Sequence, residues 1–236
     1  AEALLRWHHP KYGDIPPDKT IELAEYAGII HQLSLWILER AIEQCAAWQR
    51  SGHSVSVSVN LSVQDLANPD LTRQIGQLLE QHSLPSRGLT LEITESGMME
   101  NPKRSIDVLK ALSNMGINLA IDDFGTGFSS LSYLKKLPVN TIKIDQSFVL
   151  DMDHNESDEI IVQSTIQLGH NLGLKVIAEG IEHQGLLDIA SHYGCDEVQG
   201  FLFGQPQKAD EFLEFLAKTR QGDSGFSGFQ SAKQPA

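Results

Sequence analysis

The sequence predicts an α/β fold, a TIM-like (β/α)8 barrel in which strands and helices alternate. Seven short runs with strand character recur along the chain, at residues 2–6, 55–61, 89–95, 117–122, 141–145, 175–179 and 197–202. Longer amphipathic stretches lie between them, and this alternation is typical of βα units in a parallel sheet. The chain has 236 residues, close to the roughly 250 of such a barrel.

The individual elements follow from local patterns. Residues 55–61 alternate apolar and polar side chains with period two, as a half-buried strand does. The other strand candidates have similar length and character. The helical candidates are residues 31–49, 71–82, 102–115, 157–172 and 184–193.

One barrel domain is expected over residues 1–220, followed by a flexible tail or linker over residues 221–236. The tail is rich in Gly, Ser and Gln and has no periodicity. The chain begins within the first strand candidate and lacks an initiator Met, so we expect a fragment of a longer protein. We expect a cytoplasmic domain, which a membrane-anchored full-length protein could carry.

The composition restricts the partners. The formal net charge is −13, from 18 Lys and Arg against 31 Asp and Glu. Such a chain lacks the broad basic surface that duplex nucleic acid requires. Cys45 and Cys195 are far apart and match no metal-binding spacing, so we interpret them as structural thiols.

The most informative segment joins a strand candidate to a glycine-rich turn. The run from Asn118 ends in the adjacent carboxylates Asp122 and Asp123, and Gly125 and Gly127 follow. Two adjacent acids at the end of a strand suit a bridging site for two divalent cations. An Asp pair that opens a helix is the alternative, because Asp is favoured at caps.

Polar residues recur at the ends of most other strand candidates as well. They are Asn60, Glu92, Glu95, Lys143, Asp145, Glu179, Glu182 and Gln199. The carboxyl ends of barrel strands converge on one face, where active sites lie. Carboxylate and amide oxygens suit Mg²⁺ or Mn²⁺. A lysine among acids can stabilise a developing phosphoryl charge, or it can form a buried salt bridge to Asp145 or Asp122.

Together these segments resemble the EAL domain family of bacterial cyclic di-GMP phosphodiesterases. The similarity extends from Glu2 to Pro206. It is carried by Glu2-Ala3-Leu4-Leu5-Arg6-Trp7, Asn60-Leu61-Ser62, Glu92-Ile93-Thr94-Glu95, Asp122 to Leu131, Lys143-Ile144-Asp145, Ala178-Glu179-Gly180-Ile181-Glu182 and Gln199-Gly200-Phe201. Seven motifs in order are far more specific than any one of them.

The resemblance implies roles for individual residues. It implies metal ligation by Glu2, Asn60, Glu92, Asp122, Asp123 and Glu179, with Asp122 bridging two Mg²⁺ or Mn²⁺ ions. It implies catalytic roles for Lys143, which positions and activates the attacking water, for Glu179 as a general base, and for Glu95, which anchors the loop after Asp123. It implies substrate contacts from Arg6, Leu4, Asp145, Gln199 and Pro206.

The resemblance also implies a reaction and partners. Two cations would activate a water that opens cyclic di-GMP to linear 5′-pGpG. A homodimer would form through the loop after Asp123 and adjacent helices, and a sensory or cyclase-like domain would precede this one. The alternative is a catalytically silent receptor for cyclic di-GMP.

Two departures from the family pattern stand out. The family's antiparallel first strand, which would precede Glu2, is missing from this chain. Gly204-Gln205 stands before Pro206 where many members have Ser and a basic residue, a difference that bears on a phosphate or guanine contact.

Overall fold

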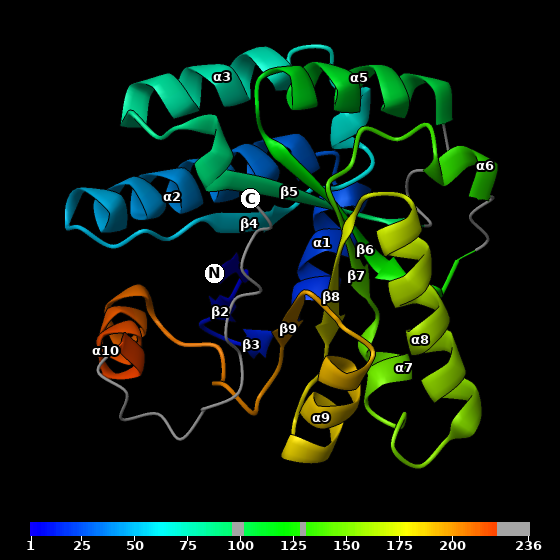
Figure 1. Cartoon of the computed structure of the whole chain (residues 1–236). Helices are drawn as coiled ribbons and strands as arrows, with labels where there is room; N and C mark the ends of the chain where they lie inside the picture. Colours follow the sequence, from blue (N-terminus) through cyan, green and yellow to red (C-terminus); the bar gives the residue numbers. More distant parts are fainter. Residues whose placement is uncertain (96–101, 128–130, 221–236) are drawn as a thin grey trace. The chain divides into compact units, whose positions relative to one another are not determined.

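The computed structural model describes residues 1–95, 102–127 and 131–220 (Figure 1). The chain divides into two compact units, Ala1–Gly204 and Gln205–Ala236. The described part of the second unit contains the helix α10 (Ala209–Arg220). The predicted tail, residues 221–236, lies outside the described residues, so the tail and the domain boundary at residue 220 stay predictions.

Seven strands form one parallel sheet in the first unit, in the order β1-β4-β5-β6-β7-β8-β9. They are β1 (Glu2–Ala3), β4 (Val57–Asn60), β5 (Leu89–Thr94), β6 (Asn118–Phe124), β7 (Thr141–Ile144), β8 (Lys175–Glu179) and β9 (Glu197–Gln199). Each lies within or overlaps a predicted run, which confirms the prediction of a TIM-like α/β barrel. Within the described residues the backbones of β1 and β9 are not paired, and the two strands meet through side chains.

Two of the strands, β1 and β9, end three residues before their predicted ends. β9 ends at Gln199 because Gly200 packs against the backbone of Ile181, whose N–H donates to the Gln199 carbonyl at 3.0 Å. A Cβ on Gly200 would lie 2.1 Å from the Ile181 oxygen. β1 ends at Ala3, and the chain then forms an antiparallel hairpin that the sequence did not predict, from β2 (Trp7–His9) and β3 (Gly13–Ile15).

In the described part of the first unit the helices are α1 (Pro17–Tyr26), α2 (Ile30–Arg50), α3 (Leu71–His82), α5 (Pro102–Asn114), α6 (Leu131–Leu134), α7 (Gln146–Val149), α8 (Glu156–Asn171) and α9 (Gln184–His192). Two 3₁₀ turns lie at Asp65–Ala67 and Ser86–Gly88. The five predicted helices are confirmed, with ends that agree within one residue. α1 and α7 were not predicted. Figure 1 shows α2, α3 and α5 beside β4 to β6, and α7, α8 and α9 beside β7 to β9.

The well-predicted helices have a clear apolar stripe or a good cap. Leu71, Ile75 and Leu79 repeat every four residues along α3 and are all buried, which is the periodicity of a helix with one face on the core. At the start of α8 the Asn155 side chain accepts a hydrogen bond from the Ser157 N–H at 3.0 Å. Such a cap satisfies a backbone donor that the helix itself leaves free.

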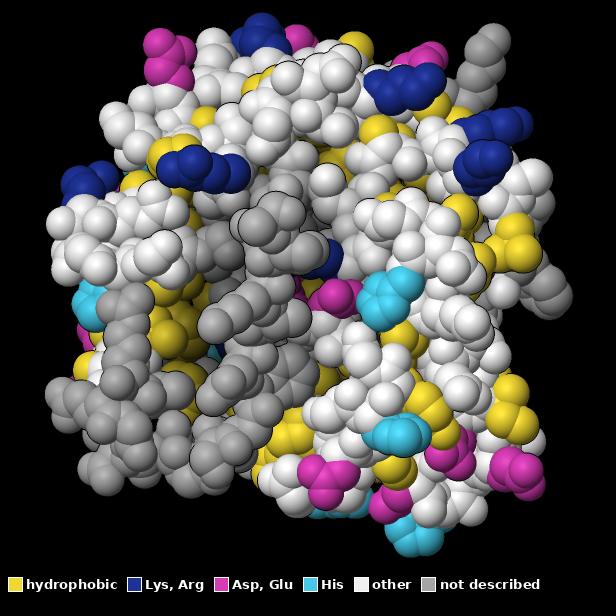
Figure 2. Space-filling model, viewed as in Figure 1, with side chains coloured by type: hydrophobic (Ala, Val, Ile, Leu, Met, Phe, Trp, Pro, Cys, Tyr) yellow, Lys and Arg dark blue, Asp and Glu magenta, His cyan; other side chains and the backbone are white. Residues whose placement is uncertain are grey.

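The core has two hydrophobic clusters, one around β4 to β6 that includes Cys45 and one around β8 and α9 that includes Cys195. On the side of the molecule that Figure 2 shows, Lys and Arg side chains are spread over the upper part of the surface. None of the helices in the described ranges has the length and apolar character needed to cross a membrane.

Candidate metal and catalytic centre

A buried lysine stands at the middle of the site. Lys143 in β7 is 1% exposed, and its Nζ lies 2.6 Å from Glu92 Oε2, 2.8 Å from Glu179 Oε1 and 3.1 Å from Asp122 Oδ1. Glu2 Oε2 is 3.9 Å away. These groups come from five strands of the sheet, so the strand order itself assembles the cluster. The predicted salt bridge of the lysine to Asp122 is therefore present.

Glu2 is held by two side-chain amides. Asn60 Nδ2 donates to Glu2 Oε1 at 2.8 Å, and Gln199 Nε2 donates to Glu2 Oε2 at 2.7 Å. Asn60 ends β4 and Gln199 ends β9, the strand at the other edge of the sheet. The two amides thus orient Glu2, and Gln199 joins the two edges of the sheet at the site.

The side chains of Asp122 and Asp123 lie in the same site because β6 is irregular at its carboxyl end. Its register with β7 shifts between Ile121 and Phe124, and Asp123 has a φ of 53°. Neighbouring side chains on a regular strand point to opposite faces, and a bulge with a left-handed residue breaks that alternation. Asp122 stays in the cluster, and its Oδ1 accepts the Asp123 N–H at 3.1 Å.

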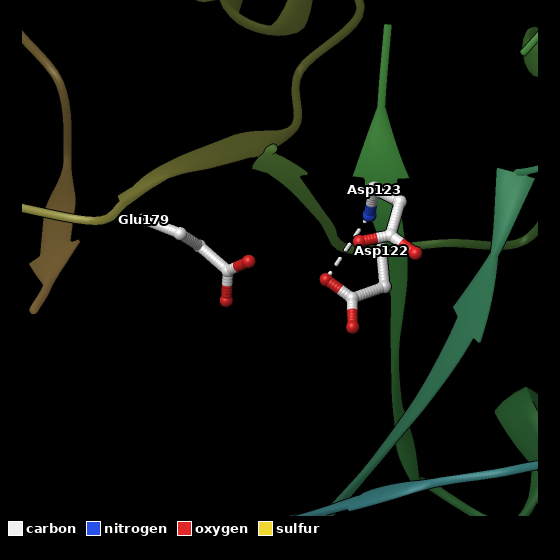
Figure 3. Close-up of side chains that lie close together, drawn as sticks. All are labelled: Asp122, Asp123 and Glu179. Carbon is white, nitrogen blue, oxygen red and sulfur yellow. Dashed lines mark hydrogen bonds between the residues drawn. The ribbon is translucent and has the colours of Figure 1, made fainter. Parts of the chain in front are cut away.

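Three carboxylates lie within reach of one cation. Figure 3 shows Asp122 and Asp123 at the tip of β6 and Glu179 extending toward them from β8. Each offers an oxygen within 4.8 Å of the others. The positions of Asp122 and Asp123 are therefore compatible with the hypothesis that both acids bind one cation.

Burial and mutual repulsion shift the pKa values of these acids. Burial raises the pKa of Glu179 to about 7, with repulsion from Asp122 adding to the effect and Lys143 opposing it. Burial also raises the pKa of Asp123 to about 6, assisted by the neighbouring carboxyls of Asp122 and Asp145. Both groups thus lie in a setting that disfavours an uncompensated negative charge.

Lys143 and Glu92 form the most buried pair of the centre. Burial raises the pKa of Glu92, although the charge of Lys143 opposes the shift. Burial alone would lower the pKa of Lys143, but Glu92 and the other carboxylates outweigh it and raise that pKa. The surrounding carboxylates therefore favour the charged form of Lys143 in the metal-free site.

Glu95 contacts the loop after Asp123. It is 2% exposed, and its Oε2 accepts the Gly125 N–H at 2.9 Å. The bond ties the end of β5 to the first turn after Asp123. Phe128, Ser129 and Ser130, which complete the predicted loop, lie outside the described residues.

Of the other predicted residues of the first unit, Asp145 lies beside Asp123, whose pKa it helps to raise. Arg6 and Leu4 are on the surface, and Arg6 Nη1 donates to the Leu5 carbonyl at 2.8 Å. Asp145 caps α7 by accepting the Ser147 N–H at 3.0 Å. Pro206 belongs to the second unit. Substrate contacts from these residues, and from Gln199, stay predictions.

The donor set of the centre fits hard divalent cations. Five carboxylates, those of Glu2, Glu92, Asp122, Asp123 and Glu179, lie around a single lysine. The excess of negative charge, and the exclusive use of oxygen donors, match the preference of Mg²⁺ and Mn²⁺. Within the described residues the two cysteines lie elsewhere, in the core.

The sequence missed the residues that support the two loops of the centre. Phe148 and Gln146 in α7 lie against Gly125 and Gly180, the glycines that follow the acids of β6 and β8. The signal that could have found them is the pair of glycines itself, because a glycine beside an acid often marks a close approach of another segment.

A parallel α/β barrel with an acidic centre at the carboxyl ends of its strands is the class that this fold and site define. Within that class, the EAL domain family matches residues 1–206. The chain belongs to the EAL domain family.

Named relatives agree with this assignment. The bifunctional diguanylate cyclase/cyclic di-GMP phosphodiesterase MucR of Pseudomonas aeruginosa is 42% identical over 217 residues, which are 92% of this chain and 32% of MucR. The cyclic di-GMP phosphodiesterase NbdA of the same organism is 40% identical over 220 residues, 93% of this chain and 28% of NbdA. The chain thus spans about a third of the length of these relatives.

A solved structure agrees as well. The structure described as PaMucR phosphodiesterase in complex with c-di-GMP superposes with a TM-score of 0.86 at 42% identity. The match covers 89% of this chain and 86% of that one.

Proposed function

We propose that this chain hydrolyses one phosphodiester bond of cyclic di-GMP and releases linear 5′-pGpG. The observation that carries the proposal is the single cluster of five carboxylates, two amides and one lysine at the ends of the strands. Two similar proteins are named as cyclic di-GMP phosphodiesterases, and a solved relative holds c-di-GMP.

The residues of the centre fall into two groups, one for each proposed cation. Asp122, Asp123 and Glu179 would hold one cation, with Glu2, Asn60 and Glu92 holding a second and Asp122 shared between them. Two such cations, when bound, supply charge that stabilises the phosphoryl oxygens and lowers the pKa of an attacking water. The acids alone would repel the phosphodiester, so the site needs this charge.

Lys143 and Glu179 have complementary tasks in the reaction. Lys143 Nζ lies among the carboxylates of Glu92, Asp122 and Glu179 and is placed to donate hydrogen bonds. It can orient a water or stabilise the phosphoryl charge. Glu179 reaches Lys143 and also lies beside Asp122, so its carboxylate is placed to accept the proton of the water. The water oxygen bonds to phosphorus, the 3′ oxygen leaves, and that oxygen takes up a proton.

The test incubates the purified chain with cyclic di-GMP and Mg²⁺ or Mn²⁺ and follows pGpG by chromatography. We expect turnover that EDTA abolishes. Asp122→Asn is expected to abolish turnover, because it removes the charge of the ligand that the two cations would share. The matched control is Asp188→Asn, on the exposed face of α9, which should turn over normally.

The outcomes separate the two candidate activities. Binding of cyclic di-GMP without turnover in the presence of both metals would favour a receptor. Neither binding nor turnover would contradict the proposal, as would full activity of Asp122→Asn.

A homodimer, an additional sensory or cyclase-like domain and a cytoplasmic location are further proposals. The dimer would use the loop after Asp123 with α5 and α6. Sedimentation of the purified chain at increasing concentration tests it, and a concentration-independent monomer would contradict it.

A further inference from the structure

The one-turn helix α7 lies between the two loops that carry the carboxylates of the candidate metal centre. One loop follows β6 and contains Gly125, and the other follows β8 and begins at Gly180. α7 follows directly after β7, which lies between β6 and β8 in the sheet. Its position therefore allows contact with both loops at once.

Phe148 closes the contact with the first loop. A Cβ placed on Gly125 would lie 2.9 Å from Phe148 Cε2, closer than two carbon atoms pack. Gly125 also has a φ of 104°, and its N–H is held by Glu95 at 2.9 Å. The loop after Asp123 thus rests on the Phe148 ring with no room for a side chain between them.

Gln146 makes the matching contact with the second loop. A Cβ on Gly180 would lie 2.8 Å from Gln146 Cβ and 3.3 Å from Gln146 Cα. Gly180 has a φ of 82° and follows Glu179 directly. The backbone that carries Glu179 therefore rests on the first residue of α7.

α7 itself is fixed at both ends. Asp145 caps its first turn by accepting the Ser147 N–H at 3.0 Å. Val149 is fully buried, in the hydrophobic cluster around β8 and α9. The helix is thus anchored in the core, while Phe148 and Gln146 lie against the two loops.

We propose that α7 is a spacer that sets the separation between the Asp122–Asp123 tip and Glu179, with Phe148 and Gln146 as positioning residues for the cation that these acids would share. The inference rests on the metal centre of the proposed function. Rigid oxygen ligands discriminate strongly by distance, and residues that orient ligands without touching the metal typically contribute about tenfold to hundredfold in affinity.

The test titrates Mn²⁺ into the metal-free chain without substrate, and follows free Mn²⁺ by electron paramagnetic resonance. Phe148→Ala is expected to weaken Mn²⁺ binding about tenfold. Val149→Ala is the matched control, because it shortens a side chain of the same helix that faces the core. It should lower the urea midpoint and leave the Mn²⁺ affinity within about twofold of the wild-type value.

A second pair of variants tests the other loop with little change in the core. Gln146→Ala keeps the Cβ that meets Gly180 and should bind Mn²⁺ as the wild type does. Gln146→Gly removes that Cβ and should bind more weakly than Gln146→Ala. This pair decides the question if Phe148→Ala does not fold.

The results also separate this inference from the proposed hydrolysis. If the wild type hydrolyses cyclic di-GMP but Phe148→Ala and Gln146→Gly bind Mn²⁺ with unchanged affinity, the spacer role is wrong and the function stands. If the expected affinity losses appear without any hydrolysis by the wild type, the spacer role stands and the function is wrong. An equal loss of affinity in Val149→Ala would reduce the effect to general destabilisation and overturn the spacer role.

Discussion

At the scale of single residues, Lys143 has the most demanding environment in the described chain. Its ammonium group is removed from water and is neutralised by Glu92, Glu179 and Asp122. A buried charge of this kind is tolerated only because its partners are in place, and removal of one partner is costly. Lys143 therefore has a structural task besides any catalytic one.

Replacement of Lys143 by Met tests that task. In metal-free protein, Lys143→Met leaves three close carboxylates uncompensated, so we expect a loss of about 3–5 kcal/mol in the free energy of unfolding. Urea unfolding at neutral pH measures it. The control is Lys175→Met, which breaks the exposed pair of Lys175 with Glu197 and should cost at most about 1 kcal/mol. Equal losses in the two variants would contradict the expectation.

Glu179 predicts a pH dependence in the absence of metal. Its pKa is raised to about 7 in the folded state, above the roughly 4.3 of an unfolded chain. Between these values the folded state binds more protons than the unfolded state, so the stability falls as the pH rises. The slope from this group is at most about 1.4 kcal/mol per pH unit.

The measurement compares wild type with Glu179→Gln by urea unfolding in EDTA, from about pH 5 to 8. The wild type should lose stability relative to the variant as the pH rises. A constant difference between the two proteins over this range would refute the shifted pKa.

The sequence predicted which residues meet at the centre better than how they meet. Adjacent acids, an amide and a lysine at strand ends could be placed at one face because parallel strands share a direction. The left-handed backbone of Asp123 could not be predicted, because it depends on the register shift between β6 and β7. The bond from Gln199 to Glu2 depends on how the edges of the sheet approach each other, which is also a tertiary property.

At the scale of elements, the loop after β6 depends on one side chain from the neighbouring strand. Glu95 is buried and accepts the Gly125 N–H. This hydrogen bond is partly buried, and a typical intramolecular hydrogen bond contributes about 0.5–1.5 kcal/mol. The loop therefore keeps its first turn because β5 provides an acceptor.

Glu95→Ala is expected to reduce turnover of cyclic di-GMP by at least about tenfold, because it frees the loop beside Asp123. The unfolding free energy should fall by only about 0.5–1.5 kcal/mol, so the fold remains. Turnover by chromatography and urea unfolding measure the two effects. Glu95→Gln keeps a carbonyl acceptor and should retain more activity than Glu95→Ala; the opposite ranking would refute the anchoring role.

The helices with a clear apolar stripe or cap were predictable, whereas α1 and α7 were not. α3 and α8 have enough turns for an apolar stripe or a cap to be recognised. α7 has four residues, too few for periodicity to appear, and it forms because Asp145 caps it and Val149 is buried. The hairpin of β2 and β3 is equally short, and its turn depends on the positive φ of Gly13.

At the scale of the whole first unit, the two hydrophobic clusters share one sheet. Cys45 lies in one cluster and Cys195 in the other, and both thiols are buried. Burial raises the pKa of Cys195 to about 11 and also raises the pKa of Cys45. Each thiol therefore reports the opening of its own cluster.

Neither thiol should react with an aromatic disulfide reagent in the native protein at about pH 7.5, because the reactive thiolate is buried and disfavoured. Both should react once urea unfolds the chain. Because the strands from β4 to β9 form a continuous ladder, we expect the two to become reactive at the same urea concentration. Labelling followed by mass spectrometry measures this, and earlier labelling of Cys195 alone would show that its half opens independently.

The side-chain junction between β1 and β9 has a mechanical consequence. Glu2 is the first residue of the sheet, and its carboxylate is held by Gln199 from the last strand. A cation that bound Glu2 would strengthen this link between the edge strands β1 and β9. A force that displaced the backbone at Glu2 would displace this ligand and weaken cation binding. The cation affinity would therefore depend on the position of β1.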